Sequence, residues 1–356
     1  MIIYILDGLN GVADFVDVFE SAIWNVQFWD LNDFELTAPG TLHNISALAV
    51  GRLLCLEKDV TEDPYTFRNV MQIETRELTY NAETGWRLKV SGAGLKKIVG
   101  QRIVWTQTNL TGSIETGIRS VITDNIISPS DSNRAISNFI LASAAGISGT
   151  FDVQLFGENI AEWLQSIGAS YGFGWDVYIS AGKYVFELKK GTDRSFRQNT
   201  VQPVVFSPDY DNLLSSVYTY SKADYKNAAL VGGEGEGTSQ RTATVGTASG
   251  LNRYEAYIDG GSVSSNGEII TPAQYTVLLQ NYGQEQLDGT AFTEKFEGEM
   301  VPNGLYKLER DYFLGDVVQI INDHGMSASS RIIEIIYSED RNGVSYIPTF
   351  SDMEGA

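Results

Sequence analysis

Short segments in which apolar and polar residues alternate, with turn signals between them, occupy most of both ends of this chain. Between residues 22 and 29 every second residue from Trp24 to Phe28 is apolar, and the residues between them are polar. This period of two is typical of a half-buried β-strand. Further strand-like runs lie at residues 2–6, 33–36, 52–57, 70–79, 86–90, 214–220, 228–231, 241–245, 254–258, 313–321, 331–337 and 344–350. Many short strands with turns such as Pro39-Gly40 between them predict a β-barrel or sandwich at each end.

The middle of the chain has helical signals instead. Ser113 is a candidate N-cap for a helix whose apolar residues recur at helical spacing from Ile114 to Ile126. Asn159 predicts the start of a second helix, with Glu162 as a capping-box partner. A hairpin follows, with strands at 175–179 and 184–188 and a turn at 180–182. Residues 106–200 are therefore predicted to form an α/β unit between two β-rich parts.

A third helix is signposted inside the second β-rich part. Thr271 is its expected N-cap, Pro272 its first residue and Gln274 its capping-box partner. The predicted apolar face consists of Tyr275, Leu278, Leu279 and Tyr282, and Gly289 can end the helix.

The length and charge limit what the chain can do. With 356 residues it exceeds the roughly 250–300 residues of a single core, which predicts two or three units. Its 25 Lys and Arg residues against 45 Asp and Glu residues give a net charge of −20. Binding to the phosphate backbone or to anionic membranes rests on clustered Lys and Arg, so this surface disfavours both. An acidic surface can still line a passage through which DNA slides.

Signals for export or membrane insertion are not found. The segment from Met1 to Leu6 has no basic flank and meets Asp7-Gly8 too soon for a secretory signal. No window approaches the ~18 uninterrupted apolar residues of a membrane span. The sequence thus predicts synthesis in a cytoplasm and no membrane span.

Residues of enzymatic type are scarce. The chain has two histidines, His43 and His324, and one cysteine, Cys55, with no HExxH, CxxC or GxSxG pattern. Cys55 lies in an apolar strand-like run, which favours a buried, inert thiol. Either histidine could be a ligand in principle, and a Ser-His-Asp triad distant in sequence stays open. We expect no catalytic, cofactor-binding or metal-binding residue and no cofactor.

Acidic loops offer an alternative. Residues Glu57–Asp59 and Glu62-Asp63 are interpreted as solvated loops and not as a glycosidase dyad. Ser130–Asn133 and Pro208–Asn212 supply oxygen atoms that could bind calcium, but neither has EF-hand spacing. Asx-turns explain both loops without an ion.

The run Gly232–Gly237 has the glycine spacing of a phosphate-binding loop. Glu234 and Glu236 would repel a phosphate, and a strand-like segment follows where a helix would be needed. A mobile hairpin tip is the interpretation that we favour, with both side chains free to point in any direction.

Four aromatic residues, Trp24, Phe28, Trp29 and Phe34, crowd into one window. They could stack on sugars or anchor a partner, but core filling is the simpler interpretation.

Several short sequence segments, taken in their order along the chain, resemble those of a known family. They are Asp33–Leu36, Val90–Leu95, Arg102–Val104, Asp193-Arg194, Tyr225–Gly235, Gly250–Glu255, Phe296–Glu299 and Leu314–Val318. The chain resembles tail proteins of long-tailed (siphovirus) phages and prophages, a family similar to the baseplate hub of contractile tails. Asn252–Tyr254 departs from the basic pair of the family pattern, and the stretch 260–268 is longer, which affects local surface contacts only.

The resemblance implies an α+β, mainly β fold: two tail-tube-like β-barrel domains with an inserted α/β domain. The expected domains are residues 1–105 (first barrel), 106–200 (α/β insert) and 201–356 (second barrel, with a helical insertion near 261–292). It also implies a non-enzymatic, homotrimeric hub ring in the virion, at the distal end of the tail. The ring would join the tail tube to the tip and surround the DNA channel.

The implied partners are the distal tail or tail-tube protein, the tape measure protein and tip or receptor-binding proteins, with no sequence-specific DNA binding. Because the chain stops at Ala356, soon after its last predicted strand, we expect the hub without a long C-terminal extension. Two alternatives stay open: a tail-associated cell-wall hydrolase (peptidase or muramidase), and a carbohydrate-binding module.

Overall fold

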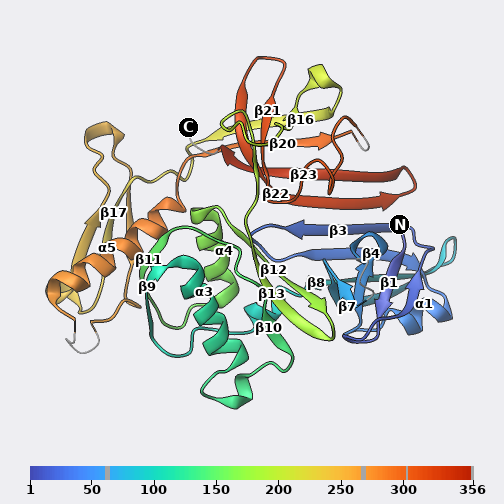
Figure 1. The fold of residues 1–356 in the computed structure, drawn as a ribbon, viewed down its shortest axis with the longest axis horizontal. Helices are drawn as coiled ribbons and strands as arrows, with labels where there is room; N and C mark the ends of the chain where they lie inside the picture. The colour runs from blue at the N-terminus through green and yellow to red at the C-terminus, as the bar shows by residue number, and fades with distance from the viewer. Residues whose placement is uncertain (61–64, 266–269, 302–303, 354–356) are drawn as a thin grey trace.

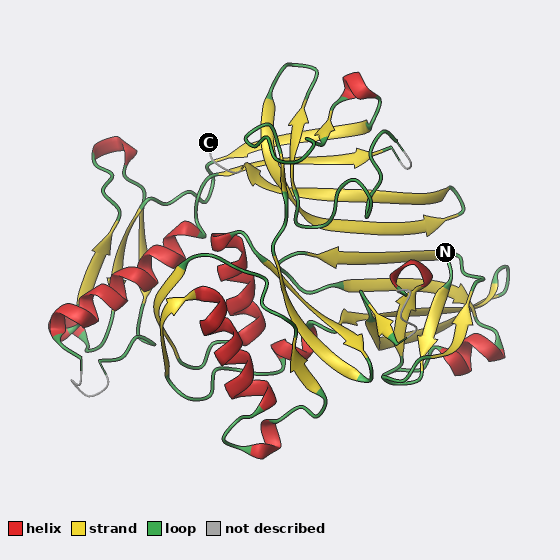
Figure 2. Ribbon diagram, in the orientation of Figure 1, coloured by secondary structure: helices red, strands yellow, loops and turns green. Residues whose placement is uncertain are grey.

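The chain folds into one large β-sheet structure flanked by a mixed α/β unit and a smaller sheet with one long helix (Figures 1 and 2). The structure is a computed structural model that describes residues 1–60, 65–265, 270–301 and 304–353. The mainly β character expected from the alternating segments is confirmed.

Within these residues, 14 strands are joined in one sheet. Its main path runs β16 (Leu213–Ser221), β20 (Thr293–Met300), β23 (Gly343–Met353), β22 (Ser327–Asp340), β3 (Ser21–Gln27), β4 (Asp33–Pro39), β8 (Gly85–Gly94), β7 (Met71–Asn81), β5 (Leu53–Leu56), β1 (Ile3–Leu6) and β2 (Val12–Val16). Beside β22 lies β21 (Val317–Ile321), and β14 (Asp193–Arg194) and β15 (Val205–Phe206) pair with β21 in parallel.

The two ends of the chain meet in the middle of this sheet. Strand β3 pairs antiparallel with β22, so that Trp24 lies opposite Tyr337, and blue and red strands run side by side in Figure 1. One apolar core contains residues from both ends, including Leu36 and Phe350. The alternation from Trp24 to Phe28 is explained by this core, because these apolar residues are buried.

The sheet path does not close on itself. The pairings of the described residues run from β16 at one edge to β2 at the other, and none joins the two edges. The two closed barrels expected from the sequence are therefore not found among these pairings.

The α/β unit predicted in the middle of the chain contains the expected elements. They are α3 (Ile114–Ile122), extended by a π-turn (Thr123–Ile127), α4 (Ile160–Tyr171), and the hairpin of β12 (Gly174–Ser180) and β13 (Lys183–Lys189). Ser113 and Asn159 cap the two helices, as predicted, by accepting hydrogen bonds from backbone N–H groups of the first turn.

Four further strands belong to this region, one of them from the first part of the chain. A four-stranded sheet has the order β10 (Phe139–Leu141), β13, β12, β6 (Thr66–Phe67), so that residues near Phe67 leave the first region to join the hairpin. A separate ribbon pairs β9 (Thr108–Ser113) with β11 (Thr150–Leu155).

The chain leaves the large sheet after β16 and returns at β20. Between them, β18 (Thr242–Val245), β17 (Ala228–Gly232) and β19 (Glu255–Asp259) form a three-stranded sheet that packs on α5 (Pro272–Asp288) around a core of its own. The predicted capping box of Thr271 and Gln274 is present. This excursion is longer than the insertion expected near 261–292, and the boundaries 1–105, 106–200 and 201–356 stay predictions.

Some elements have no sequence signal of the kind used above. They are α1 (Leu42–Ala47), α2 (Lys97–Gly100), and the strands β2, β6, β9, β10, β11, β14, β15 and β20. Helix α1 has six residues and depends on the Thr41 cap, and most of these strands are short or polar.

Candidate functional site

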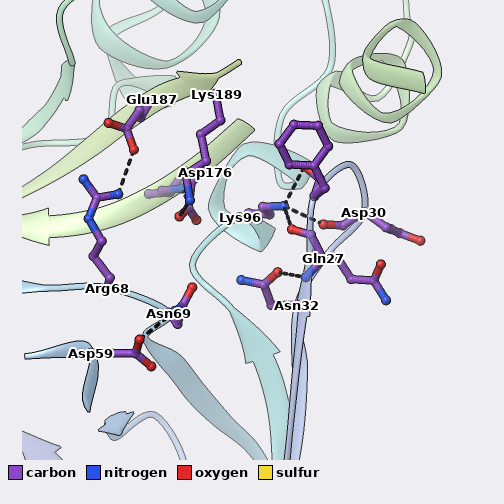
Figure 3. Close-up of polar contacts among 12 residues, drawn as sticks. Gln27, Asp30, Asn32, Asp59, Arg68, Asn69, Lys96, Asp176, Glu187 and Lys189 are labelled. Atoms are coloured by element: carbon purple, nitrogen blue, oxygen red, sulfur yellow. Dashed lines mark hydrogen bonds and ion pairs between the residues drawn. The ribbon is translucent and has the colours of Figure 1, made fainter. Parts of the chain in front are cut away.

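Two buried and three half-buried charged residues gather where the hairpin β12–β13 meets the turn between β3 and β4 (Figure 3). We call this cluster the polar junction and define it as Arg68, Lys96, Asp176, Glu187 and Lys189. Burial of charged groups without partners is costly, so their hydrogen bonds show what the cluster does.

Lys96 is the centre of the polar junction. It lies two residues after the end of β8, immediately before α2, and is only 1% exposed. Its Nζ donates hydrogen bonds to the carbonyl oxygens of Gln27 at 2.6 Å and Asp30 at 2.9 Å, and lies 3.4 Å from that of Phe28 (Figure 3). Burial lowers the pKa of Lys96 to about 7, against the attraction of Asp176. The ammonium group thus holds the β3–β4 turn against the end of β8.

The hairpin contributes the opposite charge. Asp176 lies in β12 and is 2% exposed, and its Oδ2 lies 2.6 Å from Nζ of Lys189 in β13. Burial opposes its ionisation, but Lys189 and Lys96 outweigh burial and hold the pKa of Asp176 below its ordinary value. Asp176 is therefore a carboxylate that serves two lysines from different elements.

Hydrogen bonds of Trp175, close packing at Gly174 and an ion pair at the edge complete the polar junction. The indole N–H of Trp175 donates to the carbonyl oxygen of Trp29 at 2.7 Å, and its backbone N–H donates to that of Phe28 at 3.3 Å. Gly174 leaves the space that the Phe28 ring occupies, since a Cβ there would overlap that ring. At the edge, Nη1 of Arg68 lies 2.7 Å from Oε2 of Glu187.

A second charged group joins the two ends of the chain. Asp59 is buried and accepts a hydrogen bond from Lys58 at 2.9 Å. It accepts another from Asn69 at 2.8 Å (Figure 3). Lys58 also lies 2.9 Å from Glu309, which accepts a hydrogen bond from the Tyr337 hydroxyl. Burial raises the pKa of Asp59, against the pull of Lys58. The predicted solvated loop at 57–59 is wrong for Asp59, because the residue turns inward to these partners.

A buried carboxylate fixes a loop of the α/β unit. Glu115, in the first turn of α3, accepts hydrogen bonds from the backbone N–H groups of Ala145 at 2.6 Å, Gly146 at 2.8 Å and Ile147 at 3.0 Å. Three donors on one carboxylate compensate for its burial. Glu115, like the polar junction, holds chain segments in place.

The chemistry open to these groups is that of positioning. A lysine with a lowered pKa can act as a nucleophile or a base when it touches a substrate. Lys96 is almost completely enclosed and its amine is directed at backbone carbonyls. We therefore interpret the polar junction as the structure that orients the α/β unit on the first strands.

The residues singled out as possible catalytic groups lie apart from this junction. His43 is exposed on α1, with Nε2 3.7 Å from Asp14, and His324 lies in the exposed turn between β21 and β22. Cys55 is fully buried, as predicted, and donates weakly to the carbonyl oxygen of Arg68. Burial raises the pKa of the Cys55 thiol well above its ordinary value, which disfavours the reactive thiolate.

The candidate calcium loops make turns. In Ser130–Asn133, Oδ1 of Asp131 accepts a hydrogen bond from the backbone N–H of Asn133 at 3.0 Å, as the Asx-turn interpretation predicts. In Pro208–Asn212, the Asn212 side chain bonds to the backbone of residues 205 and 207. Among the described residues, no group of three or more His, Cys, Asp or Glu side chains could hold a metal ion. Glu62-Asp63 lies outside the described residues.

The glycine-rich run Gly232–Gly237 connects β17 to β18, as predicted for a hairpin. Its Glu234 is not free to point in any direction. The carboxylate accepts hydrogen bonds from the N–H of Ser265 at 2.7 Å and from the Ser264 hydroxyl at 3.1 Å. Glu236 is exposed.

The aromatic window fills the core. Trp24, Phe28 and Phe34 are buried and Trp29 is half-buried. Core filling is thus confirmed for three of the four residues, and these three rings cannot stack on a sugar.

The polar junction had no distinctive sequence signal. The one available hint was Asp176, since aspartate is depleted in strand interiors. Because side chains alternate along β12, that of Asp176 lies on the other face of the strand from those of Trp175 and Val177. From the sequence alone, this second face is expected to be exposed to solvent. In the structure that face of β12 is also covered, and Asp176 is buried.

None of the helices in the described residues is long and apolar enough to cross a membrane.

Comparisons with known proteins agree with this fold. The model of the family described as Siphovirus ReqiPepy6 Gp37-like protein matches residues 2–351. No curated protein matches the sequence.

Three solved structures share the fold along nearly their whole length. A 43 kDa tail protein of prophage MuSo2 from Shewanella oneidensis is 11% identical, with 99% of this chain and 98% of that chain covered and a TM-score of 0.60. The tail protein from Neisseria meningitidis MC58 is 11% identical, with 99% and 96% covered and a TM-score of 0.58. Prophage tail protein gp18 from Listeria monocytogenes EGD-e is 12% identical, with 99% and 95% covered and a TM-score of 0.51.

Proposed function

This chain belongs to the Siphovirus ReqiPepy6 Gp37-like family of siphovirus tail proteins, and we propose that it is the hub of the tail tip. In this role three copies form a ring at the distal end of the tail. The ring joins the tail tube to the tip proteins and surrounds the channel through which DNA leaves.

The family match over residues 2–351 carries this proposal. The fold supports it, because it is shared with prophage tail proteins over nearly the full length of both chains. The way the chain ends meet adds a geometric argument. The strands on one side of the β3–β22 pairing and the strands on its other side could occupy two similar positions in a ring. Three copies of the chain would then present six such positions to the tail tube.

The oligomeric state tests the hub directly. Native mass spectrometry at micromolar concentration should give a trimer, and negative-stain images should show a ring with threefold symmetry. Quantitative mass spectrometry of intact tails should give three copies of the chain for each tail. A chain that is monomeric in solution and present in another copy number in tails contradicts the proposal.

We propose in addition that the role is structural and not enzymatic. The matched test is a variant with His43, His324 and Cys55 all replaced by Ala, compared with wild type on host cell wall in a zymogram. Neither protein should clear the wall. Clearing by wild type that is lost in the variant would establish the wall-hydrolase alternative.

The acidic excess fits a DNA channel. Duplex DNA carries about one charge per 1.7 Å of axis, so a wall rich in Lys and Arg would hold it, whereas carboxylates let it pass. With a net charge of −20 the chain has enough carboxylates to line a lumen. A neutral or basic lumen in the assembled ring would leave solubility as the role of the charge.

A further inference from the structure

Two of the segments singled out in the sequence, Asp193-Arg194 and Leu314–Val318, meet at a buried ion pair. Strand β14, which contains Arg194, pairs in parallel with β21, and the N–H of Val204 donates to the carbonyl oxygen of Arg194 at 2.9 Å. Nε of Arg194 lies 2.7 Å from Oδ2 of Asp316, whose side chain is only 4% exposed. Both the backbone of Arg194 and one side of its guanidinium are therefore fixed.

Asp316 is itself held by two further donors. Its Oδ1 accepts a hydrogen bond from the backbone N–H of Thr192 at 2.8 Å, and its Oδ2 accepts one from that of Phe313 at 3.1 Å. Three donors on a buried carboxylate compensate for the loss of water. Asp316 thus keeps the Arg194 side chain in one orientation before any ligand arrives, which lowers the entropic cost of binding.

The outer part of the Arg194 guanidinium is not used within the described part of the chain. Its two Nη groups make no hydrogen bond or ion pair with the described residues. The side chain is 20% exposed, and neither Nη atom is among the enclosed, partnerless atoms of these residues, so solvent reaches both. A guanidinium has five N–H donors, and four of them are therefore available to an acceptor from outside.

A cavity lies beside this guanidinium, and we call it the Arg194 cavity. Its volume is about 310 Å³, and its polar lining consists of Arg194, Gln202, Tyr306, Arg310 and Asp311. A cavity of this size admits a small molecule or a side chain of a partner protein.

The acidic residue of this lining is already paired. Arg310 donates to both oxygens of the Asp311 carboxylate, from Nε at 3.1 Å and from Nη2 at 2.7 Å. The backbone N–H of Lys307 donates to the same carboxylate at 2.8 Å. The hydrogen bonds from Arg310 and Lys307 hold the pKa of Asp311 below its ordinary value. Asp311 therefore offsets the charge of Arg310 and leaves the Nη groups of Arg194 open.

The donors indicate the kind of ligand. The planar guanidinium presents its two Nη groups side by side, which matches two oxygen atoms of one carboxylate or phosphate. We propose that the Arg194 cavity binds an oxyanion, supplied either by an acidic side chain of a partner protein or by a phosphate group. Tyr306 and Gln202 add further hydrogen-bonding groups to the same cavity.

This inference goes beyond the hub function and does not depend on it, because all the residues that it uses lie in one chain. A failure here leaves the trimer test untouched, and the reverse also holds.

The probes are N-acetylglutamate N-methylamide, which carries the carboxylate of a protein side chain, and inorganic phosphate. Each is titrated into the full chain by isothermal titration calorimetry at low, constant ionic strength, since salt screens the charges. Wild type should bind at least one probe, at one site per chain. Tighter binding of the glutamate derivative supports the proposal with an acidic side chain as the source, and tighter binding of phosphate supports it with a phosphate group.

Two variants test the cavity. Arg194→Lys keeps the positive charge but removes the pair of Nη groups, and we expect at least fivefold weaker binding. Arg310→Gln leaves the Asp311 charge without its partner side chain, and we expect binding about threefold weaker. The matched control is Arg341→Gln, which makes the same change in net charge at an exposed position of the turn between β22 and β23 and should alter binding less than about 1.5-fold.

Three results would overturn the proposal. They are a wild type that binds neither probe, an Arg194→Lys protein that binds as wild type does, and equal losses in Arg310→Gln and Arg341→Gln. The last result would mean that the anion responds to the charge of the surface at large. Circular dichroism checks the fold of each variant. If Arg194→Lys does not fold, Arg310→Gln still decides, because Arg310 is exposed and its side chain pairs only with Asp311 among the described residues.

Discussion

The polar junction and the contact of strand β11 with α5 and the loop before it, which we call the α5 seam, both attach the α/β unit to another part of the chain, but they are built in opposite ways. At the polar junction, Lys96 and Asp176 are almost completely buried and each has several partners. At the α5 seam, a few hydrogen bonds lie between cavities lined by carboxylates. The first contact pairs opposite charges within the chain, whereas the second brings the like charges of Glu158, Glu285 and Asp288 together.

The difference follows from the energetics of buried charge. A buried ion pair is stable only when geometry and hydrogen bonds are nearly ideal, so it defines one arrangement of its elements. A partly hydrated contact tolerates displacement and can accept another chain. The same α/β unit is therefore expected to be fixed on the side of the first strands and adaptable on the side of α5.

Removing the central carboxylate of the polar junction should have the largest effect. In Asp176→Ala, Lys96 and Lys189 lose their common anion while both stay in place. Breaking a buried pair in this way typically costs about 3–5 kcal/mol of unfolding free energy. Urea unfolding followed by tryptophan fluorescence measures the loss.

The matched control for Asp176→Ala is Glu35→Ala. Glu35 also pairs with a lysine on a neighbouring strand, Lys89 at 2.8 Å, but its side chain and that of Lys89 are 42% and 48% exposed. We expect a change of at most about 1 kcal/mol there. Similar losses in the two variants would show that burial does not distinguish the polar junction from the surface.

The lysine of the polar junction should give a smaller, pH-dependent effect. Lys96→Met removes the group that donates hydrogen bonds to the backbone carbonyl oxygens of Gln27 and Asp30. We expect this change to lower the free energy of unfolding by about 1–3 kcal/mol near pH 7. Because the folded-state pKa of Lys96 is about 7, below the unfolded value, the unfolded chain binds more protons between pH 7 and about 10. Wild-type stability should therefore rise with pH relative to the variant, by up to about 1.4 kcal/mol per pH unit.

Urea midpoints at pH 7, 8 and 9 measure this difference. Lys97→Met serves as the control, since Lys97 is the exposed neighbour on the same turn. A stability gap between wild type and Lys96→Met that stays constant or narrows as the pH rises would mean that the pKa of Lys96 is not lowered.

Local signals in the sequence predicted much of the fold. The capping box at Thr271, the Asn159 cap and the alternation on both sides of the turn at 180–182 act between residues close in sequence. Each is determined by a few backbone hydrogen bonds, so the residues alone show it.

The pairings between distant segments could not be predicted in this way. Strand β3 pairs with β22 across nearly the whole chain, and many strands share the same alternation. The polar junction brings together Arg68, Lys96 and Asp176, which come from three separate segments of the chain. Each of them reads as an ordinary surface charge, because burial at this site results from tertiary packing. The family resemblance is confirmed. It could be predicted because it rests on short sequence segments in a fixed order along the chain and needs no knowledge of which strands pair.

At the α5 seam, loss of a hydrogen-bonding side chain should loosen α5 without unfolding the molecule. Gln154→Ala removes both hydrogen bonds to Ser264, and we expect a cost of about 1 kcal/mol in global stability. Hydrogen exchange should be faster in peptides of α5 and unchanged in β12 and β13. The control is Gln165→Ala, because Gln165 is half-exposed on α4 and does not line these cavities. Faster exchange throughout the α/β unit would show that the two contacts are coupled, against the comparison drawn above.

The smallest effect is expected for the charge of Glu285. Because burial and the nearby Glu158 and Asp288 raise its folded-state pKa, the folded chain holds this proton to a higher pH than the unfolded chain does. Its ionisation therefore lowers stability as the pH rises from the unfolded-state pKa of about 4.5 to the raised folded-state pKa. Glu285→Gln removes the titration. Since Glu285 is half-exposed and solvent screens its charge, the gain at pH 7 should be only a few tenths of a kcal/mol, with no gain near pH 4. Thermal unfolding at the two pH values measures it, with Glu83→Gln as an exposed control. A variant that is less stable than wild type at pH 7 would mean that the Glu285 charge has a partner within the chain, and the contrast between the α5 seam and the polar junction would then fail.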